Sequence, residues 1–212
     1  MLACPFDSAR LGKEREIFFK LQYSITGSLR TFLYGEISSL CEERGEGGSV
    51  VMEEEQRRMK RVGDSQVEQS YLLMPRHING SGRLFGGQLV AWIDEVAGIV
   101  GKRHAESDVV TACFDNLIFK AGAYLNDTVV VRGHLTYVGN TSMEVRVDTY
   151  REALDGTRTM INRAYVVMVA LDEEGKTRPV PGLLTEGESA RAEWEAAKKR
   201  NEFRRLRRKE GF

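Results

Sequence analysis

The segment HINGSGRLFGGQLVAWIDEVAG, residues 77–98, runs from a glycine-rich loop into an apolar stretch with Asp94 in its middle. Apolar residues recur at spacings of three and four from Gly86, which predicts an amphipathic helix of about 18 residues. The stripe expected to pack on a sheet comprises Leu89, Trp92, Ile93, Val96 and Val100. Asp94 falls in another sector of the helix, among small residues: Gly87, Val90, Ala91, Gly98 and Gly101.

Two features make Asp94 a candidate catalytic residue. Glycine inside a helix costs up to about 1 kcal/mol relative to alanine, so several on one stripe indicate close approach by a substrate or a second subunit. A carboxylate buried there without a partner costs several kcal/mol or has its pKa raised. Asp94 is therefore predicted to be a general base or nucleophile. A structural ion pair or a backbone cap is the competing interpretation.

The start of the helix is a candidate oxyanion site. The unpaired N–H groups of Gly86 and Gly87 and the positive end of the helix dipole face whatever lies in front of them. Gly86 precedes Asp94 by eight residues, just over two turns. We therefore expect both to face the same side of the helix, within reach of one small group.

The surrounding chain predicts a sheet. Residues 66–74 are typical of a strand, and four strand-like runs follow the helix at residues 109–121, 127–138, 141–150 and 159–172. In the second run, alternation places Leu135 and Tyr137 on one face. Gly139-Asn140 and Asp155-Gly156 are typical of hairpin turns. The fold class predicted is α+β, with one long helix against an antiparallel five-stranded sheet.

The ends of the chain differ from this patterned domain. Residues 1–64 show no sustained period and are interpreted as an N-terminal extension, in which the charged stretch at Met52 favours a translation start there. Residues 65–184 form the predicted domain, and residues 185–212 a charged C-terminal helix. Nine basic residues lie between Arg191 and Lys209. Its apolar residues do not share one stripe, so we expect a solvated helix with a loose docking contact.

Composition excludes several classes of function. Thirty-one basic and 31 acidic residues cancel, so the overall charge indicates no nucleic-acid partner. No run approaches the roughly 18 apolar residues of a membrane span. Three cysteines without a CxxC pair suit a reducing cytoplasm. His77, His104 and His134 are too scattered for a zinc site, and GSGRLFGG lacks the Lys-Ser/Thr of a phosphate-binding loop.

With those residues identified, the sequence resembles the hotdog-fold acyl-CoA thioesterases, in particular the bacterial acyl-CoA hydrolases. The resemblance covers about residues 66–210. It rests on an Asn-x-x-Gly-x-x-Phe-Gly-Gly-x-x-x-x-x-x-Asp signature, on a Gly-x-Thr-Ser turn at residues 139–142, and on the basic C-terminal helix. The signature positions are Asn79, Gly82, Phe85, Gly86, Gly87 and Asp94. FKAGAYLND at residues 119–127 departs from the family's Phe-x-x-Pro-x-x-x-Gly-Asp pattern.

The resemblance implies a sheet wrapped around the central helix, a homodimer joined edge to edge, and a trimer of dimers. It implies active sites between subunits, with Asp94 as base or nucleophile, Gly86 or Gly87 as oxyanion donor, and Asn79 orienting water or the thioester. Phe85, Gly139, Asn140, Thr141 and Ser142 would contact the acyl-CoA. No cofactor or metal is implied, because CoA is part of the substrate. The basic tail has a second interpretation, contact with the CoA phosphates or a neighbouring subunit.

Three functions stay open at this point. Acyl-CoA hydrolysis needs one carboxylate and one oxyanion site, both of which the segment supplies. A hotdog hydratase or dehydratase acting on acyl thioesters needs a histidine paired with an acid, and no histidine lies at an obviously matched position. A non-catalytic acyl-CoA-binding module would tolerate loss of Asp94 while retaining affinity.

Overall fold

The computed structural model describes residues 57–211. The predictions that concern residues 1–51, including the alternative start at Met52, lie outside these residues. The elements in chain order are β1 (Met59–Arg61), α3 (Val62–Ser65), β2 (Val67–Leu72), the short 3-10 helix η1 (Pro75–His77), α4 (Gly86–Ala105), β3 (Asp108–Phe119), β4 (Thr128–Val138), β5 (Ser142–Glu152), β6 (Arg158–Leu171), β7 (Gly182–Leu184) and α5 (Gly187–Glu210).

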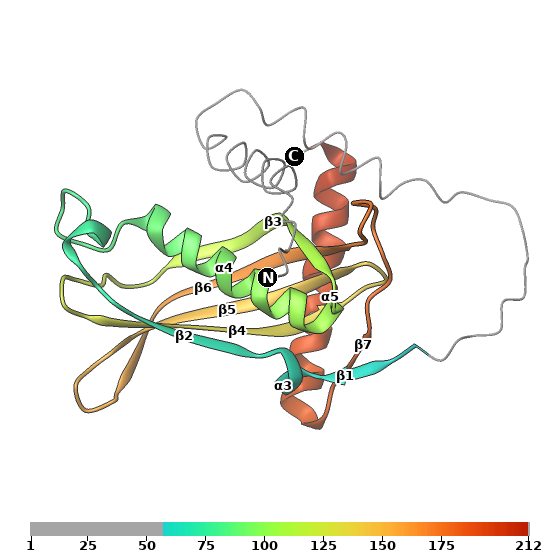
Figure 1. Ribbon diagram of the computed structural model, residues 1–212, viewed down its shortest axis with the longest axis horizontal. Coiled ribbons are helices and arrows are strands. Elements are labelled where there is room, and N and C mark those ends of the chain that lie inside the picture. Colours follow the sequence, from blue (N-terminus) through green and yellow to red (C-terminus); the bar gives the residue numbers. More distant parts are fainter. Residues whose placement is uncertain (1–56, 212) are drawn as a thin grey trace, which may run out of the picture. The chain divides into compact units, whose positions relative to one another are not determined.

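The predicted α+β architecture is confirmed. Five antiparallel strands form one sheet in the order β2-β4-β5-β6-β3, which leaves β2 and β3 at the edges. Helix α4 lies along one face of this sheet, and α5 crosses the other (Figure 1). A separate parallel pair joins β1 to β7, so ordered structure begins before residue 65, inside the segment interpreted as an extension.

The core lies between α4 and the sheet. The predicted stripe on α4 is buried in full: Leu89, Trp92, Ile93, Val96 and Val100 are each at most 4% exposed. Gly133 on β4 permits the close approach, because a Cβ at this position would stand 2.6 Å from a Val96 methyl carbon. Helix and sheet therefore hold Asp94 at a fixed height above the strands.

Two local predictions on β4 and β5 are wrong. A β-bulge shifts the register between Leu135 and Tyr137, and Tyr137 packs on Trp194 of α5 while Leu135 stays in the core. A bulge adds one residue and so reverses the alternation beyond it, which the sequence period does not reveal. The first hairpin turn is shifted as well, because Gly139 N–H donates to Ser142 O and centres the turn on Asn140 and Thr141.

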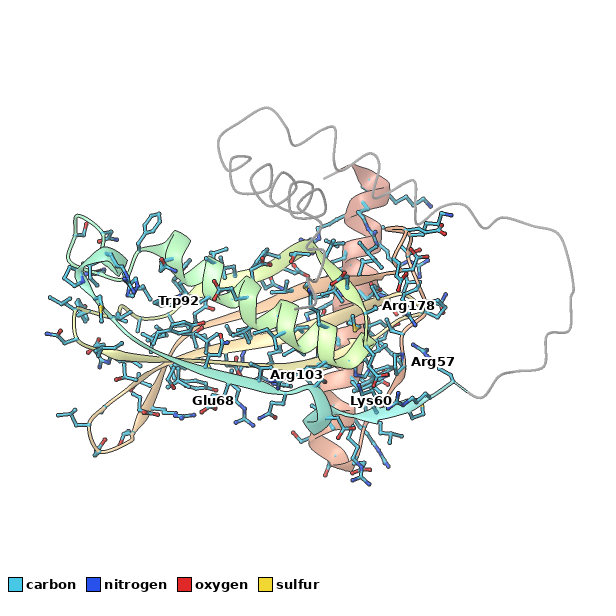
Figure 2. The ribbon with its side chains drawn as sticks, in the orientation of Figure 1. Arg57, Lys60, Glu68, Trp92, Arg103 and Arg178 are labelled. Carbon is cyan, nitrogen blue, oxygen red and sulfur yellow. The ribbon has the colours of Figure 1, made fainter. Side chains whose placement is uncertain are left out.

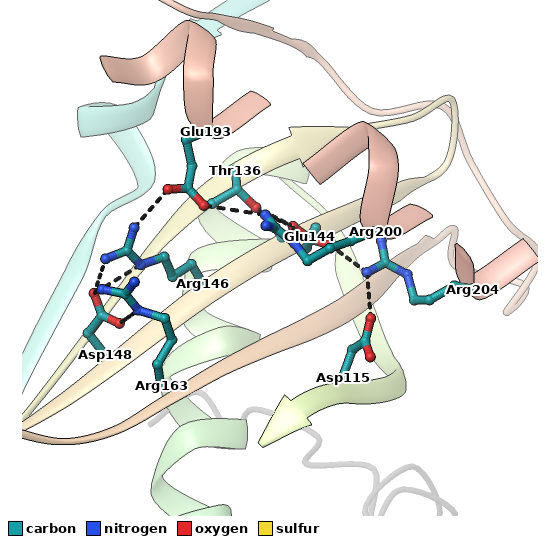
Figure 3. A network of polar contacts seen from close by, with 9 residues as sticks. All are labelled: Asp115, Thr136, Glu144, Arg146, Asp148, Arg163, Glu193, Arg200 and Arg204. Carbon is teal, nitrogen blue, oxygen red and sulfur yellow. Dashed lines mark hydrogen bonds and ion pairs between the residues drawn. The ribbon is translucent and has the colours of Figure 1, made fainter. Parts of the chain in front are cut away.

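Helix α5 docks through buried ion pairs, which corrects the expectation of a loose contact. Arg204 bridges two buried carboxylates, Glu144 on β5 and Asp115 on β3, and Arg200 pairs with Glu144 at 2.8 Å (Figure 3). Glu144 is 1% exposed. Removing one partner of such a buried pair typically costs about 3–5 kcal/mol, because an uncompensated charge stays behind. These basic residues therefore attach α5 to its own sheet.

The second network on this face has Asp148 at its centre. Arg163 and Arg146 both donate to the Asp148 carboxylate, and Arg146 continues to Glu193 of α5 at 2.8 Å (Figure 3). Together the arginines hold the pKa of Asp148 below its usual range, although burial acts in the opposite direction. The outer face of the sheet is thus charged but internally compensated.

The carboxyl end of α4 is tied to the β1–β7 pair. Lys60 Nζ donates to the carbonyl oxygens of Arg103 and His104, which are among the unpaired groups at a helix end (Figure 2). His104 is fully buried, and its Nε2 lies 3.0 Å from the carbonyl oxygen of Pro181. Burial lowers the pKa of His104, and the charges of Lys60 and Arg57 act in the same direction.

This histidine predicts a pH dependence of stability. The unfolded chain takes up a proton at His104 as the pH falls through 6.5, whereas the folded chain resists it. The free energy of unfolding is therefore expected to fall between pH 7 and pH 5. His104→Gln, which retains a donor for Pro181 but does not titrate, is expected to flatten this slope in urea unfolding at several pH values. Burial also lowers the pKa of His134, so a residual slope stays. An unchanged slope in the variant would contradict the assignment.

No helix among residues 57–211 has the length and apolar content needed to cross a membrane.

Candidate active site

Asp94 lies half-buried on the face of α4 that the sequence predicted. Its Oδ1 accepts a hydrogen bond of 2.6 Å from the Thr111 hydroxyl on β3, and no ion pair involves it within residues 57–211. Burial raises the pKa of Asp94 above that of an ordinary aspartate, and the Thr111 hydrogen bond opposes part of this effect. A carboxylate with a raised pKa and no counter-charge is a suitable base for a proton transfer near neutral pH.

Thr111 is a site residue that the sequence analysis missed. It stands opposite Met168 on β6, and its Oγ1 lies 3.5 Å from the Met168 sulfur. The register shifts between Thr111 and Cys113, so the strand bulges directly after the residue that contacts Asp94. The available signal was a single hydroxyl in an otherwise apolar run. That signal is weak, because threonine is common in strands.

The amino end of α4 carries free donors between two aromatic rings. The first N–H groups of the helix have no intrahelical partner because of their position. The N-cap residue, Phe85, has no side-chain group that accepts a hydrogen bond from them. The Phe85 ring lies so close to Gly87 that an added Cβ would stand 2.6 Å from it, and the tip of Phe119 lies 3.5 Å from the same position on Gly86. A larger residue at Gly87 would displace the Phe85 ring, whereas a Cβ at Gly86 would only touch Phe119. This arrangement is consistent with an oxyanion site at Gly86 and Gly87.

Asn79 lies in the exposed loop before the helix. Its Oδ1 accepts the backbone N–H groups of Ser81 at 2.9 Å and Arg83 at 3.2 Å, while its own N–H donates to Arg83 O at 2.8 Å. The side-chain oxygen of Asn79 therefore closes the turn, and its side-chain nitrogen, Nδ2, remains available to contact a substrate.

One chain alone does not bring Gly86 and Asp94 to the same thioester, which corrects the expectation from their spacing. Eight residues of α-helix span about 12 Å, whereas one carbonyl group must lie about 3 Å from both a base-activated water and an oxyanion donor. The residues share a side of α4 but lie too far apart along it.

The predicted substrate turn lies farther away still. Gly139, Asn140, Thr141 and Ser142 follow the end of β4, whereas the residue at its start, Thr128, pairs with Leu72 near the amino end of α4. Eleven residues of strand separate the two ends of β4 by about 33 Å. Within one chain the turn therefore does not meet Phe85, Gly86 or Gly87.

The loop at residues 120–127, whose sequence departs from the family's pattern, is held by hydrogen bonds of its own. Asn126 adopts φ 69° where the pattern has glycine, and asparagine tolerates this left-handed region. Asp127 accepts the N–H of Tyr124 at 2.8 Å, and Leu73 exchanges two backbone hydrogen bonds with Asn126 and Asp127. Gly122 replaces proline, and the Tyr124 hydroxyl lies 3.3 Å from where its Cβ would be.

Asp94 is partly exposed and does not line the cavity of about 490 Å³ that lies between the outer face of the sheet, α3, β7 and the start of α5. His134, Arg146 and Glu193 line this cavity. Within residues 57–211, no group of three or more His, Cys, Asp or Glu side chains is placed to hold a metal ion.

Comparison with known proteins identifies the family. Residues 81–155 match the model of the thioesterase superfamily. An uncharacterized acyl-CoA thioester hydrolase, YkhA of Bacillus subtilis, is 36% identical over 126 residues, which cover 59% of this chain and 73% of the relative. The chain belongs to the hotdog acyl-CoA hydrolases of the thioesterase superfamily. A hexameric acyl-CoA thioesterase has a similar structure, with a TM-score of 0.68 and 38% identity over 71% of this chain and 97% of that one.

A second solved hydrolase provides a comparison with bound ligands. The acyl-CoA hydrolase of Staphylococcus aureus, in complex with butyryl-CoA, CoA and CoA disulfide, superposes with a TM-score of 0.69 at 32% identity over 72% of this chain and 94% of its own. Structures of that enzyme also exist with one aspartate, one asparagine or one threonine replaced by alanine.

Proposed function

We propose that the protein hydrolyses acyl-CoA thioesters to a free carboxylic acid and CoA, with Asp94 as the base or nucleophile. The observation that carries the proposal is the environment of Asp94. It is half-buried with a raised pKa, it has a hydroxyl as its partner, and it lies on the same helix whose amino end offers free N–H donors.

The working unit in this proposal is a dimer joined through β3. This strand is an edge of the sheet and carries large exposed apolar side chains, with Phe114 at 37%, Ile118 at 56% and Phe119 at 53% exposure. An unpaired edge of this kind favours pairing with another strand. A two-fold axis across β3 extends the sheet and places the two α4 helices side by side and antiparallel.

The small residues of α4 support the same arrangement. Gly87 and Ala91 are exposed, and a Cβ on Gly98 would meet no atom within 4 Å. Antiparallel α4 helices that cross near Val90 bring the amino end of one helix level with Asp94 of the other. The 12 Å separation within one chain is thereby removed, and each site combines Asp94 of one protomer with Gly86, Gly87 and Asn79 of its partner.

The same two-fold operation explains the position of the Gly139–Ser142 turn. The turn lies at the end of the sheet near the carboxyl end of α4, because Asn140 O accepts the N–H of Val180 just before β7. In an antiparallel dimer that end of one protomer lies beside the amino end of the partner's α4. Thr141 and Ser142 can then border the CoA while Phe85 and Gly86 hold the acyl end.

The chemistry follows from these groups. As a base, the Asp94 carboxylate takes a proton from water while the water oxygen attacks the thioester carbon, and N–H groups at Gly86 and Gly87 stabilise the resulting oxyanion. When the tetrahedral intermediate collapses, the C–S bond breaks and the proton passes to the CoA thiolate. As a nucleophile, the Asp94 carboxylate attacks the thioester carbon, the C–S bond breaks with CoA leaving as the thiolate, and water then cleaves the mixed anhydride to the free acid and a proton, which the thiolate can take up. Thr111 orients the carboxylate in either case.

The proposal extends to assembly, domain bounds and location. Hexameric relatives favour a trimer of such dimers. The domain is taken to span residues 65–184, followed by the α5 segment at 185–212. We propose a cytoplasmic location and no resident cofactor. A relative described as a cytosolic acyl coenzyme A thioester hydrolase supports the location, although the chain spans 37% of that relative's length.

The test is a thiol-release assay with acetyl-CoA to palmitoyl-CoA as substrates. We expect wild-type protein to release CoA with saturable kinetics for at least one chain length. If the protein binds CoA tightly but hydrolyses none of the acyl-CoA substrates, it is instead an acyl-CoA-binding module.

A further inference from the structure

His77 is a buried histidine at the start of the loop that carries Asn79. Its Nδ1 accepts the backbone N–H of Met74 at 3.1 Å, and its own N–H donates to Met74 O at 2.8 Å. Both the backbone and the side chain of His77 thus hydrogen-bond to Met74 and stabilise the turn η1, which follows β2. Arg76 Nε lies 3.1 Å from the other ring nitrogen.

The loop that follows is closed on itself by backbone hydrogen bonds. His77 O accepts the N–H of Phe85, the N-cap of α4, at 2.8 Å. Ile78 pairs with Leu84, and Asn79 N–H donates to Arg83 O. The position of His77 therefore sets both the start of the helix and the turn in which Asn79 sits.

The ring of His77 links this loop to the body of α4. It meets Trp92 edge to face, with centroids 5.1 Å apart at 77°, and Trp92 stacks on Tyr71 of β2 at 4.1 Å. Trp92 lies between α4 and β2 in Figure 2. Because Trp92 precedes Asp94 by two residues, the His77 ring couples the Asn79 turn to the same helix that carries the carboxylate.

We propose that His77 is a positioning residue for the thioesterase reaction, which holds the Asn79 turn and the amino end of α4 in one geometry. The proposal rests on the function proposed above. His77 does not touch the substrate in this account, and it acts through Asn79, Gly86 and Gly87. A displacement of about 1 Å at such groups can reduce a rate by up to about a hundredfold.

Two variants of His77 separate the contacts of its ring, and a third variant elsewhere is the control. His77→Phe retains the edge contact with Trp92 and removes the acceptor for Met74, and we expect kcat to fall about tenfold with KM changed less than about threefold. His77→Asn places an amide oxygen near the position of Nδ1 but removes the contact with Trp92, and it is expected to retain more activity than His77→Phe. His134→Asn, on the outer face of the sheet, is the matched control and is expected to match wild type.

A double-mutant cycle tests whether the effect passes through Asn79. In an Asn79→Ala background, His77→Phe is expected to cause a clearly smaller further loss than tenfold, because one of the groups it positions is absent while Gly86 and Gly87 are still present. Unchanged kcat in His77→Phe, or the same tenfold loss in both backgrounds, would overturn the proposal. Thermal unfolding of each variant shows whether the fold is intact.

A structural readout keeps this inference separate from the proposed function. Amide hydrogen exchange at Ser81 and Arg83, which donate to Asn79 Oδ1, is expected to accelerate in His77→Phe and to stay at the wild-type rate in His77→Asn. Absence of thiol release from wild-type protein would refute the hydrolase. Unaltered exchange in His77→Phe would refute the positioning role, whatever the enzyme activity.

Discussion

Asp94→Asn is expected to lower kcat for thioester hydrolysis by a hundredfold or more while CoA still binds. Asparagine is close to isosteric and can retain the contact with Thr111, but it can neither accept the proton nor attack the carbonyl. Loss of a positioned base typically costs about 10² to 10⁴ in rate. The measurements are thiol release under saturating acyl-CoA and calorimetric titration with CoA. Wild-type turnover in this variant would remove the mechanism.

The raised pKa of the Asp94 carboxyl predicts one result for the pH profile of activity and one for stability. Because burial raises the pKa of Asp94 above the ordinary 3.8, the acid limb of the kcat/KM profile is expected above the range of a free aspartate. Burial of the ionised Asp94 carboxylate also lowers the free energy of unfolding at pH 7. Asp94→Asn should therefore be at least as stable as wild type in thermal unfolding. A clear loss of stability would indicate a structural role for the acid and would leave its lost activity uninformative.

Two inactive variants are expected to restore activity when they are mixed as subunits. If each site takes Asp94 from one protomer and Asn79 from the other, a dimer of Asp94→Asn with Asn79→Ala has one site with both defects and one intact site. Statistical reassembly makes half of the dimers mixed, so about one quarter of the wild-type rate should return. The measurement is thiol release after joint unfolding and refolding, with each variant refolded alone as the baseline.

The chain offers a matched control for this experiment. Asp94 and Thr111 of one protomer are hydrogen-bonded, so a mixture of Asp94→Asn with Thr111→Val damages both sites of every mixed dimer. No recovery is expected from that pair. Recovery there, or none from the Asp94→Asn and Asn79→Ala mixture, would show that the sites are not assembled between protomers.

The sequence predicted those parts of the fold that repeat regularly. The helical stripe from Leu89 to Val100 and the strand alternation each extend over several periods, and the structure places both as expected. It could not locate the bulge after Leu135, because one inserted residue changes which face a side chain occupies without changing the residue types. The docking of α5 was missed for a related reason. Arg204 appears solvated in a charged run until Glu144 and Asp115 are placed beneath it.

The candidate site shows the same division. Asp94, Gly86 and Gly87 were identified because the side of a helix on which a residue lies, and the unpaired N–H groups at its start, depend only on nearby sequence. Their roles stay proposals. Thr111 lies 17 residues from Asp94 in sequence, and only the pairing of β3 with β6 determines which of its residues face the helix. The spacing of Gly86 and Asp94 shows that they share a side of the helix, but not that they are close together. Residues on one side of a helix are neighbours only within about one turn.

The docking of α5 also limits how this protein can be shortened. A chain that stops before Gly187 exposes two carboxylates that are otherwise at most 5% accessible, Glu144 on β5 and Asp115 on β3, on either side of β6. Like charges without their arginines repel each other, and the Tyr137 ring loses its cover from Trp194. Helix α5 is thus an integral part of the fold, and removing it for crystallisation or fusion uncovers the outer face of the sheet.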